Sequence, residues 1–275
     1  MIVPCRRASL KLPGPRGALG ALRRRRCSSR KAKSHLPDPT PVLYNLPMLR
    51  AIVFDFDGVI VDSEPLHYRA FLRTGESLGF HFSYDDYLQR YVGFDDRDAL
   101  RAMLRDAGRE QASDEAAIAA LVLEKGDAFE AVVNEGIEVF DGTVEFIRHA
   151  AAAVPVAIAS GATRRDIDLI LGKLGLVGLF DPVITADMVS RSKPDPETYR
   201  LAARELAKRC SGTPIEPADC LAIEDTAAGV ESARLAGLKT LGLATTMGEA
   251  FLRGADRVVS TLEGLTVPQL RQWFD

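Results

Sequence analysis

The chain has 275 residues, of which 47% are hydrophobic and 27% charged, a composition typical of a globular protein with enough apolar side chains for a core. No apolar run approaches the roughly 18 residues that a membrane-spanning helix needs, so we expect no membrane segment. The formal net charge of −3 is small, but it is unevenly distributed along the chain.

The beginning of the chain is strongly basic. The first 37 residues hold eleven Lys and Arg and no Asp or Glu, which leaves 24 basic against 38 acidic residues and a net charge of −14 in the remainder. An acidic remainder argues against nucleic-acid binding as the main function. Residues 1–47 show no core-forming pattern and predict a disordered leader. They could be an organellar transit peptide, a tail for nucleic acid or an anionic surface built on residues 23–26, or a mis-assigned start before Met48.

The cysteines indicate the cellular compartment. Cys5, Cys27, Cys210 and Cys220 show no CxxC spacing, so a disulfide framework or a zinc site is not expected. Reduced thiols are typical of a cytosol-like compartment. We therefore expect a cytoplasmic protein, or a plastid or mitochondrial one if residues 1–47 are a transit peptide.

The first elements differ in type. Residues 51–54 form an apolar run that leads into an acidic segment with a glycine, which predicts a buried strand followed by a loop. From Glu64 to about residue 138, apolar residues such as Leu66, Ala70 and Phe71 recur at helical spacing, and strand-like runs are scarce. This predicts a wholly helical insert after the first strand.

After Phe140, strands and helices alternate. Helices are expected over residues 143–153, 164–174, 196–210 and 227–236 and from 267 onward, and strands over 154–159, 181–185, 220–223, 239–244 and 257–259. Such alternation predicts a parallel sheet. We therefore expect an α/β fold: a doubly wound, Rossmann-like parallel-sheet core of residues 48–63 and 140–275, with a small α-helical cap domain of residues 64–139.

Polar residues follow several of the expected strands. Asp55 and Asp57 follow the first, Ser160 follows the strand over 154–159, and Glu224 and Asp225 follow the strand over 220–223. Because ligands bind at the carboxyl ends of strands in open α/β sheets, these side chains are expected to converge. Clustered carboxylates repel one another and need a cation, and an all-oxygen set favours Mg²⁺.

Two further groups complete a site for phosphoryl transfer. Lys193, in a proline-flanked turn, supplies a second positive charge, and Ser160 with the amides of Gly161 and Ala162 at an expected helix N-terminus could bind an anion. A carboxylate such as Asp55 can attack phosphorus once a cation offsets the charge repulsion, forming an aspartyl phosphate. Asp57 could then act as general acid and base.

Four segments resemble the motifs of the haloacid dehalogenase-like superfamily. They are Asp55-Phe56-Asp57-Gly58-Val59-Ile60-Val61-Asp62-Ser63, Ser160-Gly161, Lys193-Pro194-Asp195-Pro196, and Ile223-Glu224-Asp225-Thr226-Ala227-Ala228-Gly229-Val230. All four occur in the family's order, and the resemblance covers about residues 49–260. The helical insert is similar to the cap of the branch that contains small-molecule phosphatases and β-phosphoglucomutase.

This resemblance implies roles for the motif residues. Asp55 is expected to be the nucleophile and Asp57 the acid/base, with Lys193 and Ser160 as the other catalytic groups. Mg²⁺ is expected to be held by Asp55, the backbone carbonyl of Asp57 and Asp225, with Glu224 bound directly or through water. The expected reaction is hydrolysis of a small phosphorylated metabolite, such as a sugar phosphate, by a monomeric enzyme.

The resemblance extends to the cap with two departures. His67 on the first cap helix and a loop containing Gly93 and Arg97 are expected to contact substrate. Basic residues that β-phosphoglucomutase carries in this loop are Val92 and Asp96 here, and Arg97 could replace them in part. This loss favours hydrolysis over the retention of a bisphosphorylated intermediate.

Other interpretations stay open. A β-phosphoglucomutase-like mutase is the alternative enzyme, and a carbon–halogen hydrolase would not need Asp57, Mg²⁺ or the acids of the fourth motif. A non-catalytic binding module is the alternative of another class. Singly, Asp55 and Asp57 are also explained as turn residues, Ser160 as a helix cap and Lys193 as a surface lysine, but four motifs in order favour catalysis.

Overall fold

The computed structural model describes residues 48–275, except residues 93, 210–212 and 247. The expected leader over residues 1–47 therefore lies outside the described residues, as do Gly93 of the cap loop and Cys5, Cys27 and Cys210. In the part of the chain that is described, no helix combines the length and apolar character needed to cross a membrane.

A parallel sheet runs through the core, with its strands in the order β3-β2-β1-β4-β5-β6. Its strands are β1 (Ala51–Phe54), β2 (Val156–Ala159), β3 (Val183–Ile184), β4 (Cys220–Glu224), β5 (Lys239–Leu243) and β6 (Arg257–Val259). β1 lies between β2 and β4, with Phe54 level with Ile158 and Ile223. Because parallel strands end at the same edge, the segments that follow β1, β2 and β4 meet there.

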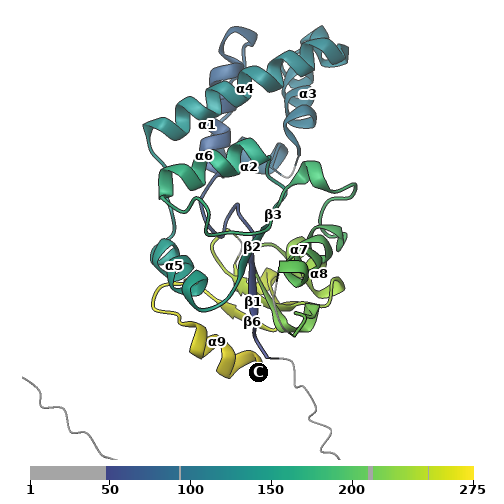
Figure 1. The fold of residues 1–275 in the computed structure, drawn as a ribbon. Helices are drawn as coiled ribbons and strands as arrows, with labels where there is room; N and C mark the ends of the chain where they lie inside the picture. The colour runs from purple at the N-terminus through teal and green to yellow at the C-terminus, as the bar shows by residue number, and fades with distance from the viewer. Residues whose placement is uncertain (1–47, 93, 210–212, 247) are drawn as a thin grey trace, which may run out of the picture. The chain divides into compact units, whose positions relative to one another are not determined.

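Helices cover both faces of the sheet (Figure 1). One apolar cluster joins the sheet to α5 (Thr143–Ala153), α6 (Arg164–Leu174) and α9 (Val267–Phe274), and a second joins it to α7 (Glu197–Arg209) and α8 (Ala227–Leu235). Within β1, Ile52 and Phe54 face the first cluster while Ala51 and Val53 face the second, as the two-residue period of a strand requires. The expected doubly wound α/β core is confirmed.

Local signals account for the element boundaries. Thr163 caps α6 through Asp166, and Gly175 ends it in the left-handed region, with φ of 63°. The expected strand over 154–159 begins only at Val156, because Val154 caps α5 and Pro155 has no N–H to donate. The strand over 181–185 is likewise reduced to the two residues of β3.

The segment between β1 and α5 is helical and forms the cap. Its helices are α1 (Glu64–Thr74), α2 (Tyr84–Arg90), α3 (Asp96–Asp106) and α4 (Glu115–Glu135). The cap has its own apolar cluster, which includes Tyr87, Leu100 and Met103. Leu66 of α1 and Phe129 of α4 instead belong to the first cluster of the core, so these two helices pack onto the core.

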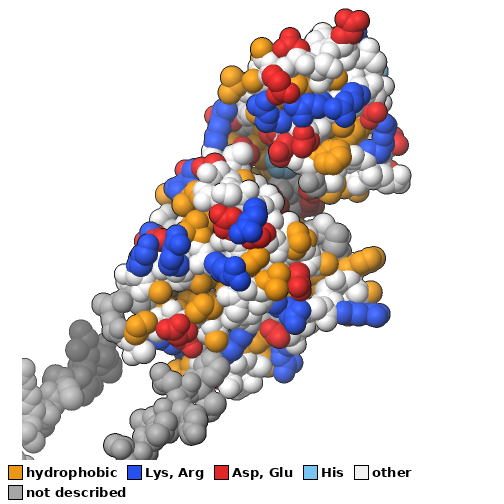
Figure 2. Space-filling view, turned by 90° about the vertical axis from the view of Figure 1, so that its right-hand side faces the viewer, with side chains coloured by type: hydrophobic (Ala, Val, Ile, Leu, Met, Phe, Trp, Pro, Cys, Tyr) orange, Lys and Arg blue, Asp and Glu red, His pale blue; other side chains and the backbone are white. Residues whose placement is uncertain are grey.

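Charged side chains on the cap surface are mostly paired. On the face shown in Figure 2, Lys and Arg side chains lie among Asp and Glu side chains over both the cap and the core. Ion pairs on the cap join Arg73 to Glu135 at 2.6 Å and Arg97 to Glu115 at 2.6 Å, and all four side chains are 40% or more exposed. Exposed pairs of this kind contribute little to stability.

Candidate active site

Three of the four expected carboxylates meet at the carboxyl edge of the sheet. Asp55 directly follows β1, and its N–H donates to the carbonyl of Ile223 on β4 at 3.0 Å. Glu224 is the last residue of β4, and Asp225 follows it. Asp55, Glu224 and Asp225 each place a carboxylate oxygen within 4.8 Å of the other two, and all three are buried. The adjacency of β1 and β4 thus brings together acids that are about 170 residues apart in the sequence.

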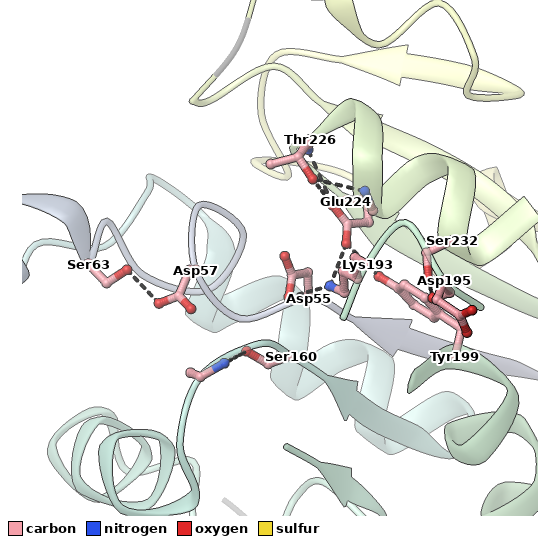
Figure 3. A network of polar contacts seen from close by, with 12 residues as sticks. Asp55, Asp57, Ser63, Ser160, Lys193, Asp195, Tyr199, Glu224, Thr226 and Ser232 are labelled. Carbon is pink, nitrogen blue, oxygen red and sulfur yellow. Dashed lines mark hydrogen bonds and ion pairs between the residues drawn. The ribbon is translucent and has the colours of Figure 1, made fainter. Parts of the chain in front are cut away.

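Lys193 lies between two of these acids (Figure 3). Its ammonium is 2.9 Å from Asp55 Oδ1 and 2.6 Å from Glu224 Oε1. Burial acts to lower the pKa of Lys193, but the charges of Asp55 and Glu224 outweigh it and raise that pKa. Burial and Glu224 raise the pKa of Asp55, while Lys193 opposes them. The lysine therefore stays protonated and offsets part of the negative charge.

Glu224 has its hydrogen-bonding capacity filled. Oε1 accepts from Lys193 and, at 2.9 Å, from the hydroxyl of Tyr199, while Oε2 accepts from the N–H of Thr226 at 3.2 Å and its hydroxyl at 3.0 Å. A carboxylate offers about four acceptor sites, so all are engaged. Gly229 permits this burial, since a Cβ there would lie 1.9 Å from the Glu224 carboxylate.

Asp225 differs from Glu224 in having an unused oxygen. Its Oδ1 is buried with no hydrogen-bond partner, and burial together with Glu224 raises the pKa of Asp225 to about 7. Oδ2 lies against Gly58, where φ is +74° and a Cβ would come within 2.0 Å of that oxygen. A buried, unpartnered carboxylate oxygen beside Asp55 fits a cation with oxygen ligands.

Asp57 is turned toward Ser63, whose hydroxyl donates to Asp57 Oδ1, while Asp55 is turned toward Lys193 (Figure 3). Burial raises the pKa of Asp57, and the hydrogen bond from Ser63 opposes this rise. A carboxyl with a raised pKa keeps its proton at a higher pH and can donate it to a leaving group.

The expected anion site at Ser160 is a loop and not the first turn of a helix. Helix α6 begins at Arg164, and Thr163 is its N-cap, so residues 160–162 precede the cap. Ser160 is 1% exposed, and its Oγ accepts from the N–H of Ala162 at 2.9 Å. The Ala162 amide is therefore engaged by Ser160 itself, and Gly161 is exposed beside it.

The cap places His67 against a lysine that the sequence motifs do not include. Lys125 of α4 is 1% exposed, and its ammonium lies 2.8 Å from His67 Nδ1 and 2.8 Å from Asp96 Oδ1. The imidazole stacks on Phe129, with ring centroids 4.5 Å apart. Burial and the charge of Lys125 lower the pKa of His67 well below its usual value, so the imidazole is neutral.

Arg97 does not join this group. Its guanidinium pairs with Glu115 on the first turn of α4 and is 48% exposed. Gly93 of the same loop is outside the described residues. Of the side chains that complete the site, Ser63 and Thr226 lie within the recognised motifs, and Tyr199 follows the third motif by three residues. Lys125 has no such signal.

Comparisons with known proteins agree with this geometry. The family model of the haloacid dehalogenase-like hydrolases matches residues 49–237. The chain is 30% identical over 223 residues to a phosphorylated carbohydrates phosphatase of Thermotoga maritima, covering 80% of this chain and 98% of that protein. It is 26% identical over 230 residues to a beta-phosphoglucomutase of Bacillus subtilis, covering 82% and 96%.

A solved structure shares both the fold and part of the sequence. CbbY from Rhodobacter sphaeroides, in complex with phosphate, superposes with a TM-score of 0.67 at 30% identity, covering 79% of this chain and 96% of that one. The family model spans well over half of the chain and includes all four motifs. The chain therefore belongs to the haloacid dehalogenase-like hydrolase family.

Proposed function

We propose that this chain is a Mg²⁺-dependent phosphatase that hydrolyses a small phosphorylated metabolite, a sugar phosphate in particular, through an aspartyl phosphate on Asp55. The observation that carries the proposal is that Asp55 lies 2.9 Å from the ammonium of Lys193 and within 4.8 Å of a carboxylate oxygen of Asp225, whose Oδ1 is buried without a hydrogen-bond partner. The substrate class is supported by relatives whose names are sugar or carbohydrate phosphatases.

The metal ligands proposed are the carboxylates of Asp55 and Asp225 and the backbone carbonyl of Asp57. Glu224 is proposed to orient Lys193 and not to bind the ion directly, because its oxygens already accept four hydrogen bonds. When bound, Mg²⁺ would offset the charge of the phosphate and allow an anionic nucleophile to approach it.

The bonds are then made and broken by Asp55, Asp57 and one water molecule. A carboxylate oxygen of Asp55 forms a bond to phosphorus, and the bond from phosphorus to the ester oxygen breaks. Asp57 gives its proton to that leaving oxygen, which the raised pKa of Asp57 favours. Asp57 then takes a proton from water, the water oxygen attacks phosphorus, and inorganic phosphate leaves with Asp55 restored.

Positioning of the phosphate is assigned to Lys193 and to the loop after β2. The Ser160 Oγ accepts from the N–H of Ala162, so its own proton is free to be donated to a phosphate oxygen. The exposed Gly161 amide is a second proposed donor. His67 is proposed to contact substrate from the cap as a neutral imidazole; contact of Gly93 and Arg97 with substrate stays a prediction.

The test is release of inorganic phosphate from a panel of phosphomonoesters in the presence of Mg²⁺. We expect turnover of sugar phosphates, and Asp55→Asn should abolish it while leaving the circular dichroism spectrum unchanged. The proposal is falsified if the purified chain hydrolyses no compound in a broad panel.

A phosphomutase is the alternative, because a relative bears that name. The two reactions differ in the group that accepts the phosphoryl from Asp55, water or a sugar hydroxyl. Incubation with β-glucose 1-phosphate and a sugar bisphosphate distinguishes them. Conversion to glucose 6-phosphate without free phosphate would replace the phosphatase assignment with the mutase.

The location and assembly proposed are those of a monomeric cytoplasmic enzyme, or of an organellar one if residues 1–47 are a transit peptide. N-terminal sequencing of the mature protein from its source distinguishes a cleaved leader from a start at Met48. Sedimentation of the purified chain tests the monomer.

A further inference from the structure

Among the described residues of the cap, Lys125 is the buried Lys or Arg, and its charge is already paired. The Lys125 ammonium lies 2.8 Å and 2.9 Å from the two oxygens of Asp96, and 2.8 Å from His67 Nδ1. Phe71 and Phe129 close the remaining sides, with ring centroids 5.2 Å and 4.9 Å away. Since Lys125 is 1% exposed, Asp96 at 28% exposed is the charged member of the pair that meets solvent.

This pair lies close to the carboxyl edge of the sheet where Asp55 and Lys193 are proposed to act, here called the catalytic edge. The loop of Asp57 and Ser63 leads directly into α1, which carries His67. From the other side, Arg165 of α6 pairs with Asp127 of α4 at 2.9 Å, two residues after Lys125. The charge of Lys125 is also among the causes that lower the pKa of Asp57. Lys125 and Asp96 therefore lie on the cap side of the loop that carries Asp57, the side from which we infer that the organic remainder of a substrate extends.

Carboxylates other than Asp96 also interact with Lys125. Glu64 of α1 and Asp166 of α6 are carboxylates whose charges interact with Lys125, and burial raises the pKa of each. The charge of Lys125 also acts on Asp57, but Asp96 is the carboxylate in contact with it, with oxygens 2.8 Å and 2.9 Å from the ammonium. Two other cations lie nearby, and both are paired: Lys193 with Asp55 and Glu224, and Arg165 with Asp127 and Glu130.

The adjoining cap loop adds no free positive charge. Among the described residues between 91 and 97, Arg97 is the one cation, and it pairs with Glu115. Val92 and Phe94 of this loop are 41% and 52% exposed. The loop thus offers apolar contacts to a ligand, and a second anionic group would find no counter-charge.

We propose that the substrate is a phosphate monoester whose remainder carries no second anionic group, and that Asp96 determines this specificity by neutralising Lys125. The inference rests on the proposed phosphatase function and narrows its substrate class. Neutral polyol and sugar monophosphates fit it, whereas bisphosphates and phosphorylated acids do not.

The test compares substrates that differ by one anionic group, namely glucose 6-phosphate with 6-phosphogluconate, and fructose 1-phosphate with fructose 1,6-bisphosphate. We expect kcat/KM to favour the substrate without a second anionic group by about tenfold or more in each pair. The reason is repulsion between that second group and the nearby carboxylate of Asp96 in a partly buried site. Asp96→Asn keeps the size of the side chain but leaves the charge of Lys125 without its counter-charge. It should therefore reduce the kcat/KM preference for the singly charged substrate by about tenfold.

Two further variants separate charge from structure. Asp96→Glu keeps the charge and should keep the preference. Asp98→Asn, on the same helix but paired outward with Arg101 at 2.7 Å and 60% exposed, should leave both the preference and the activity unchanged. Thermal denaturation of each variant confirms that it folds.

The outcomes distinguish this inference from the function on which it rests. If the wild type hydrolyses no phosphomonoester at all, the proposed function fails and takes this inference with it. If it hydrolyses both members of each pair equally, only the substrate class is wrong. If it discriminates but Asp96→Asn and Asp98→Asn behave alike, Asp96 is not the determinant.

Discussion

The catalytic edge and the cap use charge in opposite ways. At the edge, the side chains of Lys193, Asp55 and Glu224 are 14%, 11% and 0% exposed, and their charges act in a setting with little water. On the cap, pairs such as Arg97 with Glu115 are 48% and 66% exposed and are screened by solvent. Charged residues are common in both regions, so burial and not composition separates the groups proposed to act in catalysis from those that solvate the surface. Lys125 is the exception, a buried cation within the cap.

The largest expected effect is the removal of the cation at the edge. Lys193→Met leaves Asp55 and Glu224 facing each other without a counter-charge, so kcat/KM should fall by about a thousandfold. Stability should fall by about 3 kcal/mol, as for other buried pairs that lose one partner. Steady-state phosphate release and urea unfolding measure the two effects. Lys173→Met, at an exposed position on α6, is the matched control. Retention of more than about a tenth of the activity would contradict the role given to Lys193.

Next in size is the response to metal. Mg²⁺ at about a hundred times its dissociation constant should stabilise the wild type by about 2.7 kcal/mol, since the ion binds only the folded chain. Asp225→Asn should lose most of this shift in a thermal unfolding assay, which needs no substrate. Asp168→Asn, paired with Arg164 at the surface of α6, should keep it.

The same assay separates Asp225 from Glu224. Glu224→Gln should keep much of the Mg²⁺ shift while losing activity, because Glu224 is assigned to Lys193 and not to the ion. Loss of the shift in Glu224→Gln equal to that in Asp225→Asn would make Glu224 a direct ligand.

Features encoded by neighbouring residues could be predicted from the sequence. The fold was predictable because strands and helices alternate with clear stops, and the family assignment was predictable because each motif is a short run of neighbouring residues. The convergence of Asp55 with Glu224 and Asp225 followed from the rule that parallel strands end at one edge, once β1 and β4 proved adjacent.

Contacts between distant residues were not predictable. Lys125 meets Asp96 and His67, which are 29 and 58 residues away, and its place in α4 carries no motif. The expected helix over residues 164–174 is confirmed, but Ser160 does not lie at its N-terminus: Thr163 is the N-cap, and its hydroxyl accepts from the N–H of Asp166. The four hydrogen bonds to Glu224 include one from the hydroxyl of Tyr199, which is 25 residues away in the sequence and therefore was not predictable either.

A smaller effect is expected from the neutral histidine of the cap. The pKa of His67 is lowered in the folded chain, so below its usual value of 6.5 the unfolded chain binds more protons than the folded one. This contribution to stability is present above that pH and is lost as the pH falls below it. His67→Asn keeps an acceptor for Lys125 but cannot titrate. Its loss of stability between pH 7.5 and pH 5 should be smaller than that of the wild type by about 1–2 kcal/mol.

Chemical unfolding at several pH values measures this difference. His81→Asn, at an exposed position of the cap, is the control and should follow the wild type. Parallel curves for His67→Asn and the wild type would show that His67 takes up its proton in the folded chain, against the assignment of a neutral imidazole beside Lys125.

The smallest effect is expected from the exposed ion pairs between α6 of the core and α4 of the cap. Arg165 of α6 lies 2.9 Å from both Asp127 and Glu130 of α4, but the three side chains are 49%, 78% and 48% exposed. Because such pairs are screened, Arg165→Gln should change the melting temperature by no more than about 2 °C and kcat/KM by no more than about twofold at about 0.15 M salt. Arg164→Gln removes a pair within α6 alone and is the matched control. The opposite result would be a much larger loss of kcat/KM and melting temperature in Arg165→Gln than in Arg164→Gln, with a difference that grows at low salt. It would mean that an exposed ion pair holds the cap helix of Lys125 in position on the core. Burial would then no longer distinguish the functional charges from the others.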